Sequence, residues 1–241
     1  MSIDFIGQDN LRELVLQNVA AAQFHHHPVP VEHMELHMDE GCGRSTFLRY
    51  MSEMFLHNGV REFSNMDAFL ELKVPESYTE LQHLIASIAS YAVYTNKFTG
   101  IIGLDIEAVA RHVNDAQYMN CFQQMIRALT DSALFVFFLP STPRKQDAQI
   151  HTLLYEACDH YLVTIEAEEY SSDALLAILQ AQLARRQINL QFSELKPALK
   201  EALVDNTLPK SPADVKCLVK LIHHSIIHSA LTKETKMPEK V

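Results

Sequence analysis

A stretch near the N-terminus holds the residue types that bind a phosphate. Residues 41–46 read Gly-Cys-Gly-Arg-Ser-Thr and stand between a short strand-like segment and a helix-forming run. A strand, a tight glycine turn and a helix N-terminus point backbone N–H groups at an anion, and a hydroxyl there can hold Mg²⁺. Compared with G-x-x-x-x-G-K-[ST], the stretch keeps Gly43 and Ser45 but has Met38 for the first glycine and Arg44 for the lysine. The pattern predicts a modified phosphate loop.

Two acidic residues in the same loop work against a bound triphosphate. The carboxylates of Asp39 and Glu40 add repulsion where backbone N–H groups should dominate. Arg44 keeps the positive charge, but its planar guanidinium does not replace a compact ammonium like for like. We therefore expect phosphate binding to be weakened and not abolished, so ATP or ADP with Mg²⁺ stays an open alternative as ligand and no cofactor is certain.

The elements that must position this loop follow from apolar spacing. Strands that alternate with helices predict a parallel sheet with helices on both faces. The segment Met34 to Met38 alternates apolar and polar residues, which predicts a half-buried strand and not a central one. Ala133 to Leu139 is continuously apolar and predicts a buried strand. The other predicted strands are 69–74, 100–105 and 161–165, and a capping box predicts a helix over 78–94.

Beyond Glu169 the pattern changes to helices alone. Helices are expected at 174–186, at 194–204 and from Ser211-Pro212 onward. The sequence therefore predicts an α/β domain over 1–169 and a helical subdomain over 170–241.

Composition excludes several classes of protein. The 241 residues carry a net charge of −10, which argues against a surface built for DNA or RNA. No apolar run approaches the roughly 20 residues of a bilayer span, and the N-terminus has no secretory pattern, so we expect a cytoplasmic protein. Four scattered cysteines predict reduced thiols. Histidines 25–27, with His33 and His37, are interpreted as solvated loop side chains, since adjacent side chains do not converge easily on one ion. His224 and His228 are interpreted as surface or interface side chains, since no H-E-x-x-H glutamate accompanies them.

The order of these features resembles the AAA+ ATPase family, and most closely the clade of the Holliday-junction branch-migration motor and the Rubisco-activase type. The resemblance rests on Phe5-Ile6-Gly7-Gln8, the 41–46 loop, the strand ending in Asp105, Ser141-Thr142 after the aromatic strand, and Pro212-Ala213 in the last helix. It implies a three-layer parallel-sheet P-loop NTPase domain with a C-terminal helical lid.

The resemblance also implies roles for particular residues. Asp105 and Ser45 would hold Mg²⁺, and Glu107 is the candidate for the carboxylate that orients the attacking water. The family has that glutamate directly after the aspartate, whereas Ile106 stands between them here and side chains alternate along a strand. Asp105 equally suits a carboxylate that caps a turn. The nucleotide-binding candidates are Ile6, Gly41, Cys42, Gly43, Arg44, Ser45, Thr46, Ser141, Thr142 and Ala213.

Several charged groups of the family pattern are replaced. Ala213 stands where the lid arginine would be, and Cys158-Asp159-His160 where the family usually has an arginine that reaches a neighbouring subunit. These losses favour a degenerate AAA+ domain that hydrolyses no nucleotide or binds it weakly, and acts as an interaction or regulatory subunit with a protein partner or a second copy. Two alternatives stay open: an active ATP-binding ATPase with variant motifs, and a DNA-associated, loader-like accessory factor.

Overall fold

The computed structural model of the chain describes residues 5–25, 31–60, 69–94, 100–130, 132–142, 144–188 and 211–222. The chain divides into two compact units. The first comprises Met1–Glu40 and Arg44–Glu168, and the second joins Gly41–Gly43 to Glu169–Val241. The grouping of three loop residues with the C-terminal part was not anticipated from the sequence.

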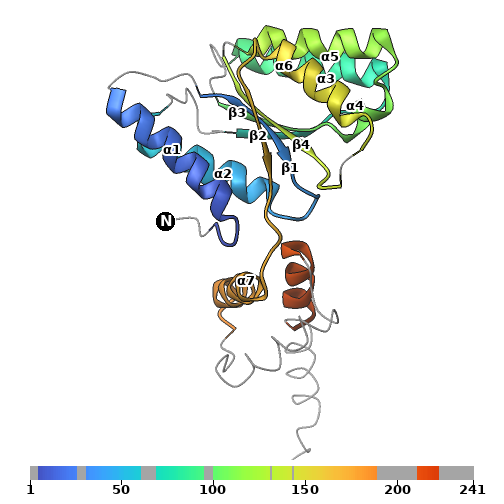
Figure 1. The fold of residues 1–241 in the computed structure, drawn as a ribbon. Coiled ribbons are helices and arrows are strands. Elements are labelled where there is room, and N and C mark those ends of the chain that lie inside the picture. The colour runs from blue at the N-terminus through green and yellow to red at the C-terminus, as the bar shows by residue number, and fades with distance from the viewer. Residues whose placement is uncertain are drawn as a thin grey trace, which may run out of the picture. The chain divides into compact units, whose positions relative to one another are not determined.

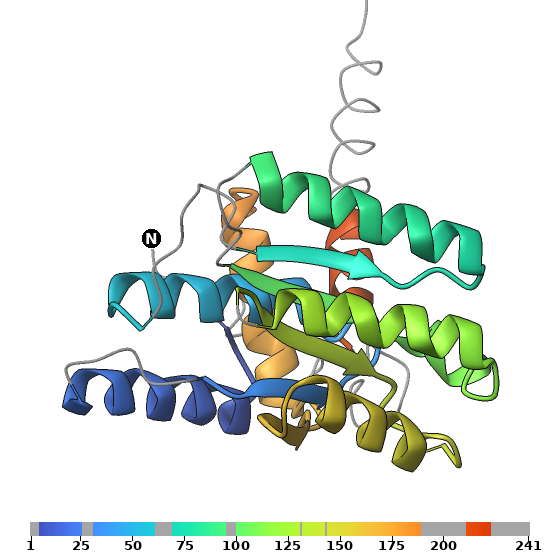
Figure 2. The ribbon, with the colours of Figure 1, turned by 90° about the horizontal axis from the view of Figure 1, so that it is seen from above.

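The first unit is built on a five-stranded sheet with the order β2-β3-β4-β1-β5 (Figure 1). Every pairing in it is parallel, and the arrows in Figure 2 run in one direction. The predicted parallel sheet is therefore confirmed. The strands are β1 (His33–His37), β2 (Phe69–Lys73), β3 (Ile101–Asp105), β4 (Leu134–Leu139) and β5 (Leu162–Glu166).

The prediction that the first strand is only half buried is wrong. β1 lies between β4 and β5, and Glu35 at its centre is 2% exposed. The alternating polar residues can be buried because they have partners. The Glu35 carboxylate contacts His37 and His151, and the backbone N–H of Phe135 donates to His33 Nδ1 at 3.0 Å.

Helices cover both faces of this sheet (Figure 1). On one face lie α1 (Asp9–His25) and α2 (Arg44–His57). On the other lie α3 (Tyr78–Tyr94), α4 (Glu107–Arg111), α5 (Ala116–Leu129) and α6 (Asp147–Ala157). Neither α4 nor α6 was predicted from the sequence. The buried residues Ile150, Leu154 and Ala157 of α6 have helical spacing, so that signal was present.

The helix that follows the phosphate loop is fixed by close packing on the sheet. A Cβ added at Gly103 of β3 would lie 2.5 Å from Leu48 Cδ1 of α2 and 3.0 Å from the Phe138 ring. Only glycine leaves room for Leu48 at this point, so α2 is seated tightly against the sheet.

The second unit has its own apolar cluster. It contains α7 (Ser172–Arg185), whose N-cap Ser171 accepts a hydrogen bond from Ala174 N at 3.2 Å, and a helix over 212–222. Leu175, Leu179 and Leu183 of α7 pack with Val215 and Val219. The predicted helix at 194–204 lies outside the described residues. None of the described helices is both long and apolar enough to cross a membrane.

Candidate phosphate-loop site

The loop after β1 has the backbone geometry of a glycine turn leading into a helix. Gly41 and Gly43 adopt φ of +85° and +99°, a region that side-chain-bearing residues rarely enter. Arg44 is the first residue of α2. The strand, turn and helix are thus present as the sequence predicted, and the side chains decide what the loop can bind.

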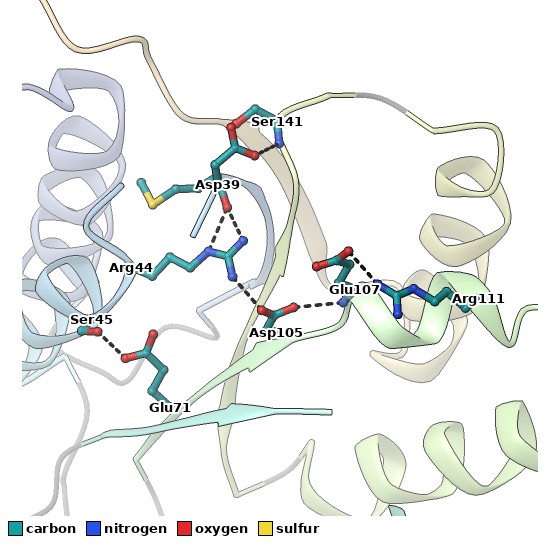
Figure 3. A network of polar contacts seen from close by, with 9 residues as sticks. Asp39, Arg44, Ser45, Glu71, Asp105, Glu107, Arg111 and Ser141 are labelled. Carbon is teal, nitrogen blue, oxygen red and sulfur yellow. Dashed lines mark hydrogen bonds and ion pairs between the residues drawn. The ribbon is translucent and has the colours of Figure 1, made fainter. Parts of the chain in front are cut away.

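Arg44 is turned into the protein. Its side chain is 8% exposed, its Nε donates to the carbonyl oxygen of Met38 at 2.8 Å, and Nη2 donates to the same oxygen. Nη1 donates to Asp105 Oδ2 at 3.0 Å, and the guanidinium carbon lies 5.1 Å from the centre of the Phe138 ring. Figure 3 shows this side chain between the loop and the end of β3. The charge that would meet a phosphate is engaged in internal contacts.

The residues predicted to hold Mg²⁺ are engaged as well. Asp105 Oδ2 is paired with Arg44, and Oδ1 accepts the backbone N–H of Glu107 at 3.0 Å, so Asp105 does cap the turn into α4. The Ser45 hydroxyl donates to Glu71 (Figure 3). Magnesium needs oxygen ligands with free negative charge, and a guanidinium on Asp105 repels a second cation. In this arrangement the residues do not fit a magnesium–nucleotide complex.

The candidate base is also directed to another partner. The Glu107 carboxylate accepts from Arg111 Nη2 at 3.1 Å, and Arg111 also pairs with Glu76. These three side chains are exposed ones on the surface of the unit. The carboxylate that the resemblance assigns to the attacking water is thus engaged in an ion pair on the surface.

The loop carboxylate of Asp39 contacts the backbone that follows the neighbouring strand β4. Asp39 Oδ1 accepts the backbone N–H of Ser141, just after β4, at 2.9 Å (Figure 3). Thr142 is exposed in the same connection. The structure therefore brings Asp39, Arg44, Ser45, Asp105 and Ser141 to one edge of the sheet, the carboxyl edge.

In the second unit, the tip of the loop is held through its carbonyl groups. The Tyr170 hydroxyl donates to Cys42 O at 2.7 Å, and the backbone N–H of Ala213 donates to Gly41 O at 3.1 Å. A Cβ added at Gly41 would lie 2.7 Å from Ala213 Cβ. The loop thus contacts Ala213 itself, at the position where the resemblance implied an arginine. The hydroxyl contact of Tyr170 was missed from the sequence.

The N-terminal segment is anchored beside the end of β5. Gln8 is fully buried; its Nε2 donates to Glu168 O at 2.7 Å, and Glu168 N donates to its Oε1 at 2.9 Å. Ile6, one of the nucleotide-binding candidates, is half-buried in this segment, and Thr46, another, is exposed on α2.

A second polar cluster is centred on Glu35 of β1. Glu35 Oε1 is 3.1 Å from His37 Nε2, and Oε2 is 2.7 Å from His151 Nδ1. Burial would raise the pKa of Glu35, but hydrogen bonds from both histidines outweigh it and leave that pKa below its ordinary value. The hydrogen bond to Glu35 raises the pKa of His37 against the effect of burial.

No metal-binding group was found where the chain is described. None of the His, Cys, Asp and Glu side chains there form a set of three or more that could hold an ion. The histidines at 26 and 27 and at 224 and 228 lie outside the described residues.

An apolar groove of about 360 Å³ lies between α3 and α5, and none of the nucleotide-binding candidates lines it.

Comparisons with solved structures agree on the fold. A replication initiator DnaA bound to AMPPCP and single-stranded DNA superposes with a TM-score of 0.58 and 13% identity, covering 97% of this chain and 66% of that one. The Thermotoga maritima RuvB Holliday junction branch migration motor gives 0.59 and 13%, covering 93% and 65%. AMPPCP-bound DnaA from Aquifex aeolicus gives 0.56 and 15%, covering 93% and 65%. The chain thus spans just under two thirds of the length of these structures.

The sheet order, the loop and these superpositions define the class: the chain has the α/β P-loop NTPase fold found in AAA+ ATPases. No protein-family model matches the sequence, and no curated protein matches it.

Proposed function

We propose that this chain is a degenerate AAA+ domain that does not hydrolyse nucleotide and works as an interaction or regulatory subunit. The observation that carries the proposal is the engagement of Arg44 with Met38 O and Asp105. To meet a phosphate, the guanidinium would have to leave Asp105, whose side chain is 15% exposed. Breaking a buried ion pair costs about 3–5 kcal/mol. That cost would weaken phosphate binding by a factor of roughly 10² to 4 × 10³.

Hydrolysis has a further obstacle in this proposal. Hydrolysis needs a side chain that orients the attacking water, and the candidate for that role, Glu107, is paired with Arg111. The hydrophobic core and the parallel sheet persist while the chemical groups are replaced. A fold that is retained while its catalytic groups are replaced suits a role in binding a protein partner or a second copy of the chain.

The test is ATP turnover by the purified chain. We expect no turnover above the background of a mock preparation, and no change on Asp105→Asn. Turnover at rates typical of ATPases that Asp105→Asn abolishes would contradict the proposal and support the active-ATPase alternative. Calorimetric titration of ATP and ADP with Mg²⁺ up to millimolar concentration, on the wild type and on Arg44→Ala, then measures whether weak binding remains.

The DNA-associated alternative has one observation in its favour. One of the similar structures is a replication initiator bound to single-stranded DNA. The net charge of −10 opposes it, because phosphate contacts need basic side chains. Fluorescence anisotropy with labelled single-stranded DNA decides the matter. Binding that weakens steeply between low and physiological salt would favour the accessory-factor alternative over a purely protein-binding role.

A further inference from the structure

Two oppositely charged side chains leave the same turn and reach different strand ends. The Asp39 carboxylate accepts the backbone N–H of Ser141 after β4, and the Arg44 guanidinium donates to Asp105 at the end of β3. The Met38 carbonyl, directly after β1, also accepts from Arg44. The ends of β1, β3 and β4 are thereby joined through one turn.

In a working phosphate loop these connections are made by the ligand. An anionic phosphate accepts backbone N–H groups, and a cation shared with it is held by the strand-end aspartate and the loop hydroxyl. Here the anion that takes an N–H is a carboxylate of the loop itself. The cation beside Asp105 is a guanidinium of the same loop, and the Ser45 hydroxyl has turned to Glu71.

We propose that this chain carries its own substitutes for phosphate and metal, with Asp39 in the role of the anion and Arg44 in the role of the cation. This inference rests on the proposed loss of nucleotide chemistry and adds how the site is regulated. A site occupied by side chains of the same chain keeps one conformation, whereas a phosphate-bound loop changes conformation when its phosphate leaves. The binding of a partner should then be independent of nucleotide and of Mg²⁺.

Charge explains why the two substitutes exclude the ligand. Asp39, Arg44 and Asp105 together carry a net charge of −1. The Asp39 carboxylate would repel a polyanion that approached the turn, and Arg44, paired with Asp105, would repel a divalent cation. A small oxyanion becomes acceptable only when the carboxylate is removed.

The anion half is tested by chemical rescue of Asp39→Ala in the full chain. We expect Asp39→Ala to lower the melting temperature by about 2–4 °C, as suits one charge-assisted contact in a domain of this size. Inorganic phosphate or acetate should restore at least half of that loss relative to chloride at equal ionic strength. Glu40→Ala, which removes the adjacent exposed carboxylate, is the matched control and should gain from these anions no more than the wild type does.

Amide hydrogen exchange at Ser141 gives a local measure of the same contact. Its N–H should exchange faster in Asp39→Ala than in the wild type and slow again when phosphate is added. An Asp39→Ala protein that melts and exchanges like Glu40→Ala, or that gains nothing specific from the anions, overturns the proposal.

The cation half is tested with Mg²⁺ alone as the probe. The wild type should melt at the same temperature with and without millimolar Mg²⁺, and Arg44→Ala should be stabilised by the ion because Asp105 is then released. If Arg44→Ala does not fold, Arg44→Lys supplies the measurement, since its ammonium cannot reach both Met38 O and Asp105 as the guanidinium does. Equal stabilisation of the wild type and the variants by Mg²⁺ overturns this half.

The proposed function and the internal substitutes can be contradicted separately. ATP turnover by the wild type contradicts the proposed function. Absence of anion rescue in a chain without turnover contradicts the internal substitutes and leaves the proposed function standing.

Discussion

Arg44 Nη1 donates to Asp105 Oδ2 at 3.0 Å and thereby ties the start of α2 to the end of β3. A lysine with its single ammonium could reach a phosphate from this position, whereas the guanidinium satisfies two acceptors at once. Arg44 is therefore paired within the protein at both of these acceptors.

The first prediction concerns the stability supplied by this pair. Arg44→Ala should lower the free energy of unfolding by about 3 kcal/mol, because Asp105 loses the partner of a largely buried charge and Met38 O loses its donor. Urea denaturation measures the change. Arg111→Ala is the matched control, since it removes an arginine paired with two carboxylates on the exposed surface. A loss no larger than that of Arg111→Ala would show that the buried pair contributes little.

The second prediction concerns the tip of the loop. Gly41→Ala should be more destabilising than Gly59→Ala, although both glycines have positive φ. The left-handed backbone alone costs an alanine about 1–2 kcal/mol at either position. At Gly41 the new Cβ would also lie 2.7 Å from Ala213 Cβ, whereas nothing lies within 4 Å at Gly59. Overpacking should add about 1–3 kcal/mol.

Denaturation of the two glycine variants side by side isolates this contact. Equal losses would mean that Gly41 is required by its backbone conformation and not by Ala213. Tyr170→Phe, which removes the hydroxyl that donates to Cys42 O, should cost about 1 kcal/mol and reports on the neighbouring carbonyl.

The sequence predicts the layers of this fold well because apolar spacing is a local signal. β4 is buried along its whole length, and α3 begins at Tyr78 and ends at Tyr94, as the periodicity and the capping box predicted. β1 was misjudged for a physical reason. Two of the partners of its buried polar residues come from more than 100 residues away: His151 for Glu35 and the backbone N–H of Phe135 for His33. Spacing within one strand carries no information about such a partner.

The strand, glycine turn and helix of the loop were predictable from the sequence, whereas the contacts of its side chains were not. The loop glycines, Ser45 and Asp105 could be found from a pattern, and the missing lysine predicted weaker phosphate binding. That Arg44 turns inward to Asp105, and Asp39 toward Ser141, depends on how close the strand ends come together. Those distances arise from the sheet order, which motif spacing does not specify.

The third prediction is a pH dependence of stability that originates at Glu35 and His37. The pKa of His37 is raised from 6.5 in the folded protein. Its contribution to stability is therefore complete below its pKa in the unfolded state and is lost as pH rises through its pKa in the folded state. The pKa of Glu35 is lowered from 4.5, so its contribution is complete above that value and is lost as pH falls through the folded one. The stability that this pair contributes is therefore greatest between about pH 4.5 and pH 6.5.

Urea denaturation across this range checks the assignment. His37→Gln should flatten the alkaline side of the profile, and Glu35→Gln should reduce both sides because it removes the acidic group and the partner that raises the pKa of His37. Asp147 adds a smaller electrostatic contribution to the raised pKa of His37, so Asp147→Asn should shift the alkaline side to lower pH without removing it. An unchanged profile in His37→Gln would place the pH dependence elsewhere.

The last prediction concerns the packing that seats the helix of the phosphate loop. Gly103→Ala should destabilise the chain by about 1–3 kcal/mol, because the new Cβ would lie 2.5 Å from Leu48 Cδ1 and 3.0 Å from the Phe138 ring. Leu48 extends from α2, one turn after Arg44, so relief of the clash by movement of that helix would draw the guanidinium away from Asp105. Combining Gly103→Ala with Leu48→Ala should cost less than the sum of the two single changes, because the smaller side chain makes room for the new methyl group. Strict additivity of the two losses would mean that the contact between β3 and α2 does not limit the position of the loop helix.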